Sequence, residues 1–348
     1  MNVLFMIGNG FDLNVGLKTG FPDFLPVYVE LPSDNDYIAQ FKKTIKGEGI
    51  KNWSNFEARL GKYAEEFAAD TSDNLILCRD NFLKELVNYL KQEESKIDFP
   101  SRADEIRTGF TKSITNYYAA LSPVSEEQIK TVYARCANVT HHYNFISFNY
   151  TGVLDNCVRI VKSQQKAVIQ HFHPNGSVMV DKMNDVLHIH GTVDKHPILG
   201  VDNISQIINS SLAADKECSR LLLKTEQNNA LRNRNNNDGY TLIEKSAIIC
   251  VFGMSIGETD ETWWKKLGQW LMKDDSRQLI FIDVEDGYSE SQTTQSIRIR
   301  DRIISRFCDR AYIPEDKRDI CEQRIHVALN TDIFKINLTD TAKLPSEK

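Results

Sequence analysis

The chain opens with the stretch VLFMIGNGFDLNVGL at residues 3–17, in which five apolar residues lead directly into Gly-Asn-Gly. A continuous apolar run ended by glycine predicts a strand buried on both faces, as in a parallel sheet. Three interpretations compete for the stretch: a signal peptide, a plain turn or a nucleotide cradle. The run is too short for the apolar part of a signal peptide and follows no basic segment, which excludes the first interpretation.

Four more short apolar runs repeat this strand pattern, at residues 143–148, 186–189, 247–252 and 279–284. Between the last two runs, Trp263, Leu267, Trp270 and Leu271 are spaced to share one helix face. Strand, glycine turn, helix and strand in this order are typical of right-handed βαβ units. The sequence therefore predicts a Rossmann-like α/β fold with a mostly parallel sheet flanked by helices.

Residues 25–140 show helical rather than strand periodicity, and we expect them to form a helical insertion or subdomain after the first strand. The sheet domain would then comprise residues 1–24 and 141–340. Ser125 and Gln128 have the spacing of a capping box, which places a helix start at Ser125.

Three other segments carry structural predictions. In NWSNFEARL, residues 52–60, Ser54 and Glu57 also have capping-box spacing, and we favour a structural role for this motif over a functional one. The Asn-rich residues 226–239 lack apolar periodicity and predict a surface loop that could cover a site. Residues 341–348 are expected to form a disordered tail.

Composition restricts the classes of partner. The net charge of −6 over 348 residues disfavours broad nucleic-acid binding, which is usually carried by a basic domain. Seven cysteines without a Cys-x-x-Cys pair are typical of reduced thiols in a cytoplasmic protein. No apolar stretch approaches the ~20 residues of a membrane span, so we expect no membrane association.

The glycines after the first strand form the first candidate site. Gly8, Asn9 and Gly10 begin a phosphate-binding pattern, but Leu13 stands where the dinucleotide fingerprint has its third glycine. A structural turn explains this stretch alone equally well. Asp12 is either a helix cap or an acceptor for ribose hydroxyls.

Two other candidates also follow predicted strands. Asn149 would project into the crevice where open α/β sheets bind ligands, or would cap a helix that begins near Thr151. Gly253, Ser255 and Gly257 form a second glycine turn. The helix after that turn would be capped by Thr259 or by Asp260.

Histidines supply a fourth candidate. Strand alternation would place His188 and His190 on one face, with the strand ending at Gly191. Together with His171 and His173, and with Asp194 and Asp202 nearby, they raise a metal-site hypothesis. There are two alternatives to a metal site. A histidine at a strand end can be a hydrogen-bonded structural group, or one imidazole can transfer protons, and we assign no metal ligand.

Taken in order, six motifs resemble those of the AbiH family of bacteriophage abortive-infection proteins, and the resemblance extends from the first strand to about residue 260. The motifs are IGNGFDLNVGLKT, NWSNFEARL, FISFNYTGVLD, HIHGTVD, ILGVDN and FGMSIGETD. The family in turn resembles the sirtuin-like NAD-binding fold. Asn149 is similar to the strand-end asparagine of sirtuins, and His190 before Gly191 is similar to their His-Gly motif.

The departures from sirtuins indicate which chemistry the resemblance implies. The cysteine module that binds zinc in protein deacylases is missing, and Leu25 replaces the arginine after Pro-Asp-Phe. The resemblance implies NAD hydrolysis rather than deacylation, with NAD as substrate and no required cofactor. Asn149 would position a water or a ribose hydroxyl, and His190 would act as general base. The nucleotide would be held by Gly8, Asn9, Gly10, Phe11, Asp12, Gly253, Ser255, Gly257 and Asp260.

Two alternative functions stay open at this point: a nucleotide sensor or scaffold without turnover, and a metal-dependent hydrolase. Beyond NAD or a related nucleotide, the partners expected from the resemblance are a phage trigger and a second copy of the chain.

Overall fold

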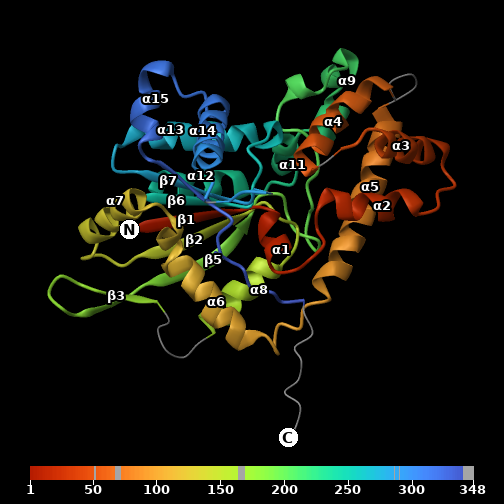
Figure 1. Cartoon of the computed structure of the whole chain (residues 1–348). Helices are drawn as coiled ribbons and strands as arrows, with labels where there is room; N and C mark the ends of the chain where they lie inside the picture. The colour runs from red at the N-terminus through yellow and green to blue at the C-terminus, as the bar shows by residue number, and fades with distance from the viewer. Residues whose placement is uncertain (51, 67–71, 164–168, 286, 290, 340–348) are drawn as a thin grey trace, which may run out of the picture.

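The computed structural model describes residues 1–50, 52–66, 72–163, 169–285, 287–289 and 291–339. At its centre is a six-stranded sheet in the order β5-β2-β1-β6-β7-β8, with every neighbouring pair parallel (Figure 1). The strands are β1 (Asn2–Ile7), β2 (His142–Ser147), β5 (Lys182–His188), β6 (Ile248–Phe252), β7 (Gln278–Asp283) and β8 (Ile325–Leu329). This is the strand order of doubly wound dinucleotide-binding folds, and it confirms the predicted fold class.

Alternation along each strand divides the core between the two faces of the sheet. In β1, Val3, Phe5 and Ile7 contribute to one apolar cluster, while Leu4 and Met6 contribute to the other. The first cluster is covered by α1 (Gly10–Asn14), α6 (Ala103–Thr115), α7 (Pro123–Arg135) and α8 (Val153–Lys162). The second is covered by α12 (Asn235–Lys245), α13 (Glu261–Lys273), α14 (Thr293–Arg310) and α15 (Glu315–Glu322).

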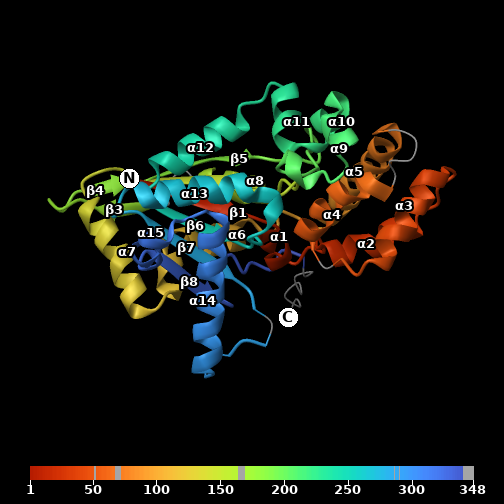
Figure 2. The same cartoon turned by 90° about the horizontal axis from the view of Figure 1, so that it is seen from above.

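A separate helical group lies beyond the carboxyl ends of the strands (Figures 1 and 2). It contains α2 (Phe21–Glu30), α3 (Asp36–Gly47), α4 (Trp53–Glu66) and α5 (Ser72–Glu94), joined by α9 (Ser210–Ala214), α10 (Lys216–Leu222) and the 3-10 turn η2 (Ile204–Gln206). Stacked and edge-on aromatic rings fill its core, with Phe82 against Phe24 and Phe56. The remaining helices before β2, namely α6, α7 and the 3-10 turn η1 (Tyr117–Ala120), pack on the sheet instead.

Most of the Asn-rich segment 226–239 is helical, so the predicted loop is wrong except for a short turn at 231–234. It spans α11 (Lys224–Ala230) and the start of α12. Gln227 and Asn228 are buried, and their side-chain amides donate to the carbonyls of Leu199 and Lys224. Because these bonds satisfy the polar groups internally, a polar sequence is compatible with packed helices here.

Both predicted capping boxes are wrong by a few residues. Ser122 caps α7, with Pro123 at the first helical position, so the helix begins earlier than expected. At the start of α4 the Asn52 side chain accepts from the Asn55 N–H, and Ser54 lies inside the first turn.

Three further findings complete the fold. The sequence did not predict two of the observed features: a hairpin of β3 (Gln170–Phe172) and β4 (Val178–Val180), and strand β8. Within the described part of the chain, no helix is long and apolar enough to cross a membrane. The predicted tail at 341–348 falls outside the described residues.

Candidate functional site

A cavity of about 760 Å³ lies at the carboxyl ends of the strands, between the sheet and helices α2 and α4. It spans the point where strand order reverses, between β1 and β6, which is where open α/β sheets bind nucleotides. Its volume falls within the range of small-molecule sites. Among its lining residues are the predicted Gly8, Asn9, Gly10, Asp12, Asn149, His190, Gly253, Ser255 and Asp260.

Two predicted nucleotide contacts are not among the lining residues. The Phe11 ring is buried in the sheet core against Phe110 and Phe334. Gly257 closes a turn instead, where its carbonyl accepts from the Trp264 indole N–H.

The glycines of the two turns are required by the contact between the turns. Gly10 N–H donates to the Gly253 carbonyl at 3.0 Å, and Gly8 N–H donates to the Phe252 carbonyl at 2.9 Å. A Cβ at Gly10 would lie 2.5 Å from the Gly253 Cα, and Gly253 itself has a φ of 63°. Only glycine allows both the close approach and this backbone conformation.

Asn149 is held at the cavity wall by a buried carboxylate. Its Nδ2 donates to Asp12 Oδ1 and to the Gly8 carbonyl, both at 3.1 Å, while Thr151 Oγ1 donates to Asp12 Oδ2 at 2.7 Å. Helix α8 has Gly152 as its N-cap, so the capping interpretation of Asn149 is wrong. Both amide hydrogens of Asn149 are occupied, which leaves its side-chain oxygen as the acceptor for a ligand.

Asp12 lies inside the short helix α1 and is almost fully buried, so it is not the predicted helix cap. Burial raises the pKa of this carboxyl to about 7, although the bonds from Thr151 and Asn149 oppose the rise. Asp12 therefore titrates near neutral pH.

His188 and His190 do not share a face, because β5 ends at His188 and the chain turns at Gly191, whose φ is 71°. The ring nitrogens of His188 lie 3.0 Å from the Asn149 carbonyl and 2.7 Å from Asp155 Oδ2. His190 instead lines the cavity, with its ring edge-on to Phe148 and its Nε2 3.5 Å from Asp260 Oδ1.

A buried charge network adjoins His190, and sequence reasoning missed two of its members. Lys224 Nζ donates to Glu57 Oε2 at 2.9 Å, to the Thr259 carbonyl at 3.0 Å and to Asp260 Oδ1 at 3.2 Å. Lys224 was not singled out, and Glu57 was assigned to a helix cap. The Glu57 side chain lines the cavity rather than closing a capping box, and its place in the NWSNFEARL motif was the available signal.

The network has opposite effects on its two carboxyls. Burial disfavours ionisation of Asp260, but the Lys224 ammonium and the bond to His190 outweigh it and hold the pKa of Asp260 well below its usual range. Burial dominates at Glu57 and raises the pKa of its carboxyl, although Lys224 opposes the rise.

The predicted histidine metal set is not assembled among the described residues. His173 accepts from the Asn175 N–H in the hairpin turn, and His171 joins His141 and Asp181 at the amino ends of β2 and β5. The rings of His141 and His171 stack with centroids 3.9 Å apart and planes 9° from parallel. A single ion cannot lie in the planes of two stacked rings, so we interpret this cluster as a hydrogen-bonded contact between hairpin and sheet.

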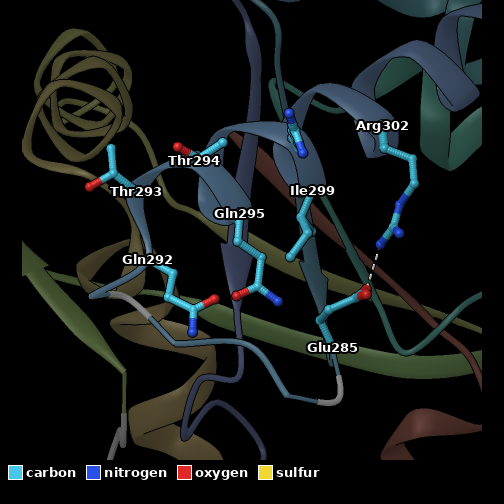
Figure 3. A pocket seen from close by; sticks show the side chains of 8 residues that line it. Glu285, Gln292, Thr293, Thr294, Gln295, Ile299 and Arg302 are labelled. Atoms are coloured by element: carbon cyan, nitrogen blue, oxygen red, sulfur yellow. Dashed lines mark hydrogen bonds and ion pairs between the residues drawn. The ribbon is translucent and has the colours of Figure 1, made fainter.

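A second cavity, of about 620 Å³, lies along the first turns of α14 (Figure 3). Glu285 and Arg302 line both cavities, and Arg302 Nη2 donates to Glu285 Oε2 at 2.5 Å. None of the predicted site residues lines it.

The sequence model of one protein family, described as bacteriophage abortive infection AbiH, matches residues 4–282. The chain belongs to this family. The match includes the turns after β1, β2, β5 and β6, so the cavity of this AbiH-family protein lies largely within the family region. A search of curated proteins finds no match. Membership confirms the predicted AbiH resemblance and makes the chain a bacteriophage abortive-infection protein.

Proposed function

We propose that this AbiH-family protein is an NAD glycohydrolase that depletes NAD in the infected cell. The observation that carries the proposal is the placement of Asn149 and His190 in one cavity with the glycine turns of β1 and β6. The doubly wound strand order and these two residues also support a sirtuin-like relationship.

In the proposed complex, the diphosphate lies over the glycine turns at the strand-order reversal. The N–H groups of Gly8 and Gly10 already bind carbonyls, so these glycines contribute the absence of a side chain rather than hydrogen bonds. Asn9 and Ser255 also line the cavity and supply polar groups beside the phosphates. The nicotinamide end then lies toward Asn149 and His190, over the β2 and β5 side of the sheet.

The bond between nicotinamide and ribose breaks through an oxocarbenium-like state, as in glycoside hydrolysis. The electron pair of the bond leaves with the nicotinamide nitrogen, and a water oxygen bonds to the anomeric carbon. The free oxygen of Asn149 accepts a hydrogen bond from this water, and His190 takes its proton. General-base assistance of this kind typically contributes about 10²–10⁴-fold to the rate.

Asp260 acts on His190 as a positioning residue. Its Oδ1 lies 3.5 Å from His190 Nε2, and the same oxygen accepts from Lys224. Because Asp260 orients His190 at Nε2, the other ring nitrogen, Nδ1, is available to accept the proton of water.

The test incubates purified protein with NAD and separates the products by chromatography. We expect equal amounts of nicotinamide and ADP-ribose, and no effect of a chelator. Tight NAD binding without product would indicate the sensor alternative, and loss of turnover with chelator would indicate a metal-dependent hydrolase. A phage component is the proposed trigger, so the assay includes extract from infected cells.

A further inference from the structure

Glu57 contributes a buried carboxyl to the cavity from the helical group rather than from the sheet. It lies on α4, it is 7% exposed, and it lines the same cavity as Asn149 and His190. Its Oε2 accepts from Lys224, and no described residue donates to Oε1. One oxygen is therefore fixed by the protein and the other is free to face a ligand.

The surrounding charges do not cancel. Lys224 supplies one positive charge between two carboxylates, Glu57 and Asp260, so the three side chains together carry one excess negative charge when both acids are ionised. Lys224 itself is not among the cavity-lining residues, and its three donors are all occupied. The excess charge is thus presented to the cavity by the carboxylates.

We propose that Glu57 is a catalytic carboxylate that stabilises the positive charge at the anomeric carbon during cleavage, an inference that rests on the proposed NAD hydrolysis. In the ground state the positive charge of NAD is centred on the nicotinamide ring. As the bond breaks, that charge moves to the ribose ring while nicotinamide leaves neutral. A fixed carboxylate beside the ribose stabilises the transition state more than the ground state, which is the condition for raising kcat.

The negative charge of the site also matches the leaving group of the reaction. Neutral nicotinamide leaves without needing a proton, so the site requires a base and a counter-charge rather than a general acid. His190 serves as the base, and Glu57 supplies the counter-charge from helix α4. The ion pair with Lys224 fixes the orientation of Glu57 and opposes the burial that raises the pKa of this carboxyl, without neutralising the cluster.

The test compares Glu57→Gln, which keeps the size and removes the charge, with Glu93→Gln. Glu93 is a matched control because it is 5% exposed, pairs with Lys96 and does not line the cavity. We expect Glu57→Gln to lower kcat by about 10²–10³-fold, with the Kd for NAD changed less than about threefold. Glu93→Gln should keep the wild-type kcat.

A second readout separates chemistry from structure. Formate added to Glu57→Ala should restore part of kcat by replacing the missing carboxylate, whereas formate should not affect Glu93→Ala. If Glu57→Gln does not fold, Glu57→Asp takes its place and should lower kcat at least about tenfold because its carboxylate is set back from the ribose.

The outcomes distinguish the two proposals. Two results would overturn the role of Glu57 alone while the wild type is active. One is a Glu57→Gln variant as active as wild type, and the other is a Glu57→Ala variant whose activity formate does not restore. Wild type that never releases nicotinamide would overturn the proposed function and this inference together.

Discussion

Asn149 Nδ2 donates to Asp12 Oδ1 at 3.1 Å, which ties the turn after β2 to the helix after the neighbouring strand β1, beside the strand-order reversal. The Thr151 hydroxyl occupies the other Asp12 oxygen. Asp12 thus fixes which atom of Asn149 is free, and this is a more specific role than the ribose contact expected from the sequence.

The Asp12 carboxyl makes stability depend on pH. Its folded-state pKa of about 7 is above the ordinary 3.8, so the unfolded chain loses this proton first as pH rises. The contribution is fully present below about pH 4 and is lost as pH rises through about 7, amounting to at most about 4 kcal/mol. Urea unfolding should show Asp12→Asn gaining stability relative to wild type across this range. A difference that stays constant with pH would refute the prediction.

Gly253→Ala should separate the two glycine turns. The new Cβ would meet Gly10 Cα at 2.5 Å, and the φ of 63° adds about 1–2 kcal/mol of backbone strain. We expect lower stability and at least about tenfold weaker NAD binding by calorimetry. Gly47→Ala, in helix α3, is the control, because nothing lies within 4 Å of its new Cβ, and it should leave NAD binding unchanged without lowering stability. Equal behaviour of the two variants would contradict the account of the turns.

Lys224→Met should be strongly destabilising, since it leaves the buried Glu57 and Asp260 carboxylates without their cation. The expected loss is about 3–5 kcal/mol in the free energy of unfolding. Lys265→Met, at a more exposed ion pair with Glu261, should cost less than about 1 kcal/mol.

A double-mutant cycle gives the sharper version of this test. Adding Glu57→Gln to Lys224→Met should cost less than the sum of the two single changes, by about 0.5–3 kcal/mol, because one uncompensated charge is removed. Strict additivity would show that the two side chains are not coupled.

The sheet was predictable because buried parallel strands leave continuous apolar runs in the sequence. Strands β1, β2, β6 and β7 were predicted to within about one residue at each end, whereas only the carboxyl half of β5 was predicted. Strand β8 (Ile325–Leu329) was missed because it contains His326. The His326 ring is buried, and it is hydrogen-bonded to the Gln278 side chain on β7. From a single sequence, a buried polar residue whose hydrogen bond comes from a neighbouring strand cannot be distinguished from an exposed polar residue.

The site was predictable only where a residue follows a strand. Asn149 and His190 were found in this way, because the carboxyl ends of parallel strands meet at one edge. Glu57 and Lys224 are 167 positions apart and meet through the helical group, so neither local spacing nor strand order indicates their pairing. Helices α11 and α12 were missed for a related reason: the side chains of Gln227 and Asn235 donate to the carbonyls of Leu199 and His188, which are distant in the sequence.

The central claim is tested most directly by measuring free nicotinamide released from NAD by wild type, Asn149→Ala and His190→Ala. The account predicts turnover by wild type, and at least about 100-fold less from each variant, with both variants still folded by circular dichroism. Turnover that survives both substitutions would contradict the assignment of these two residues. Wild type that binds NAD and leaves it intact would contradict the enzymatic function itself.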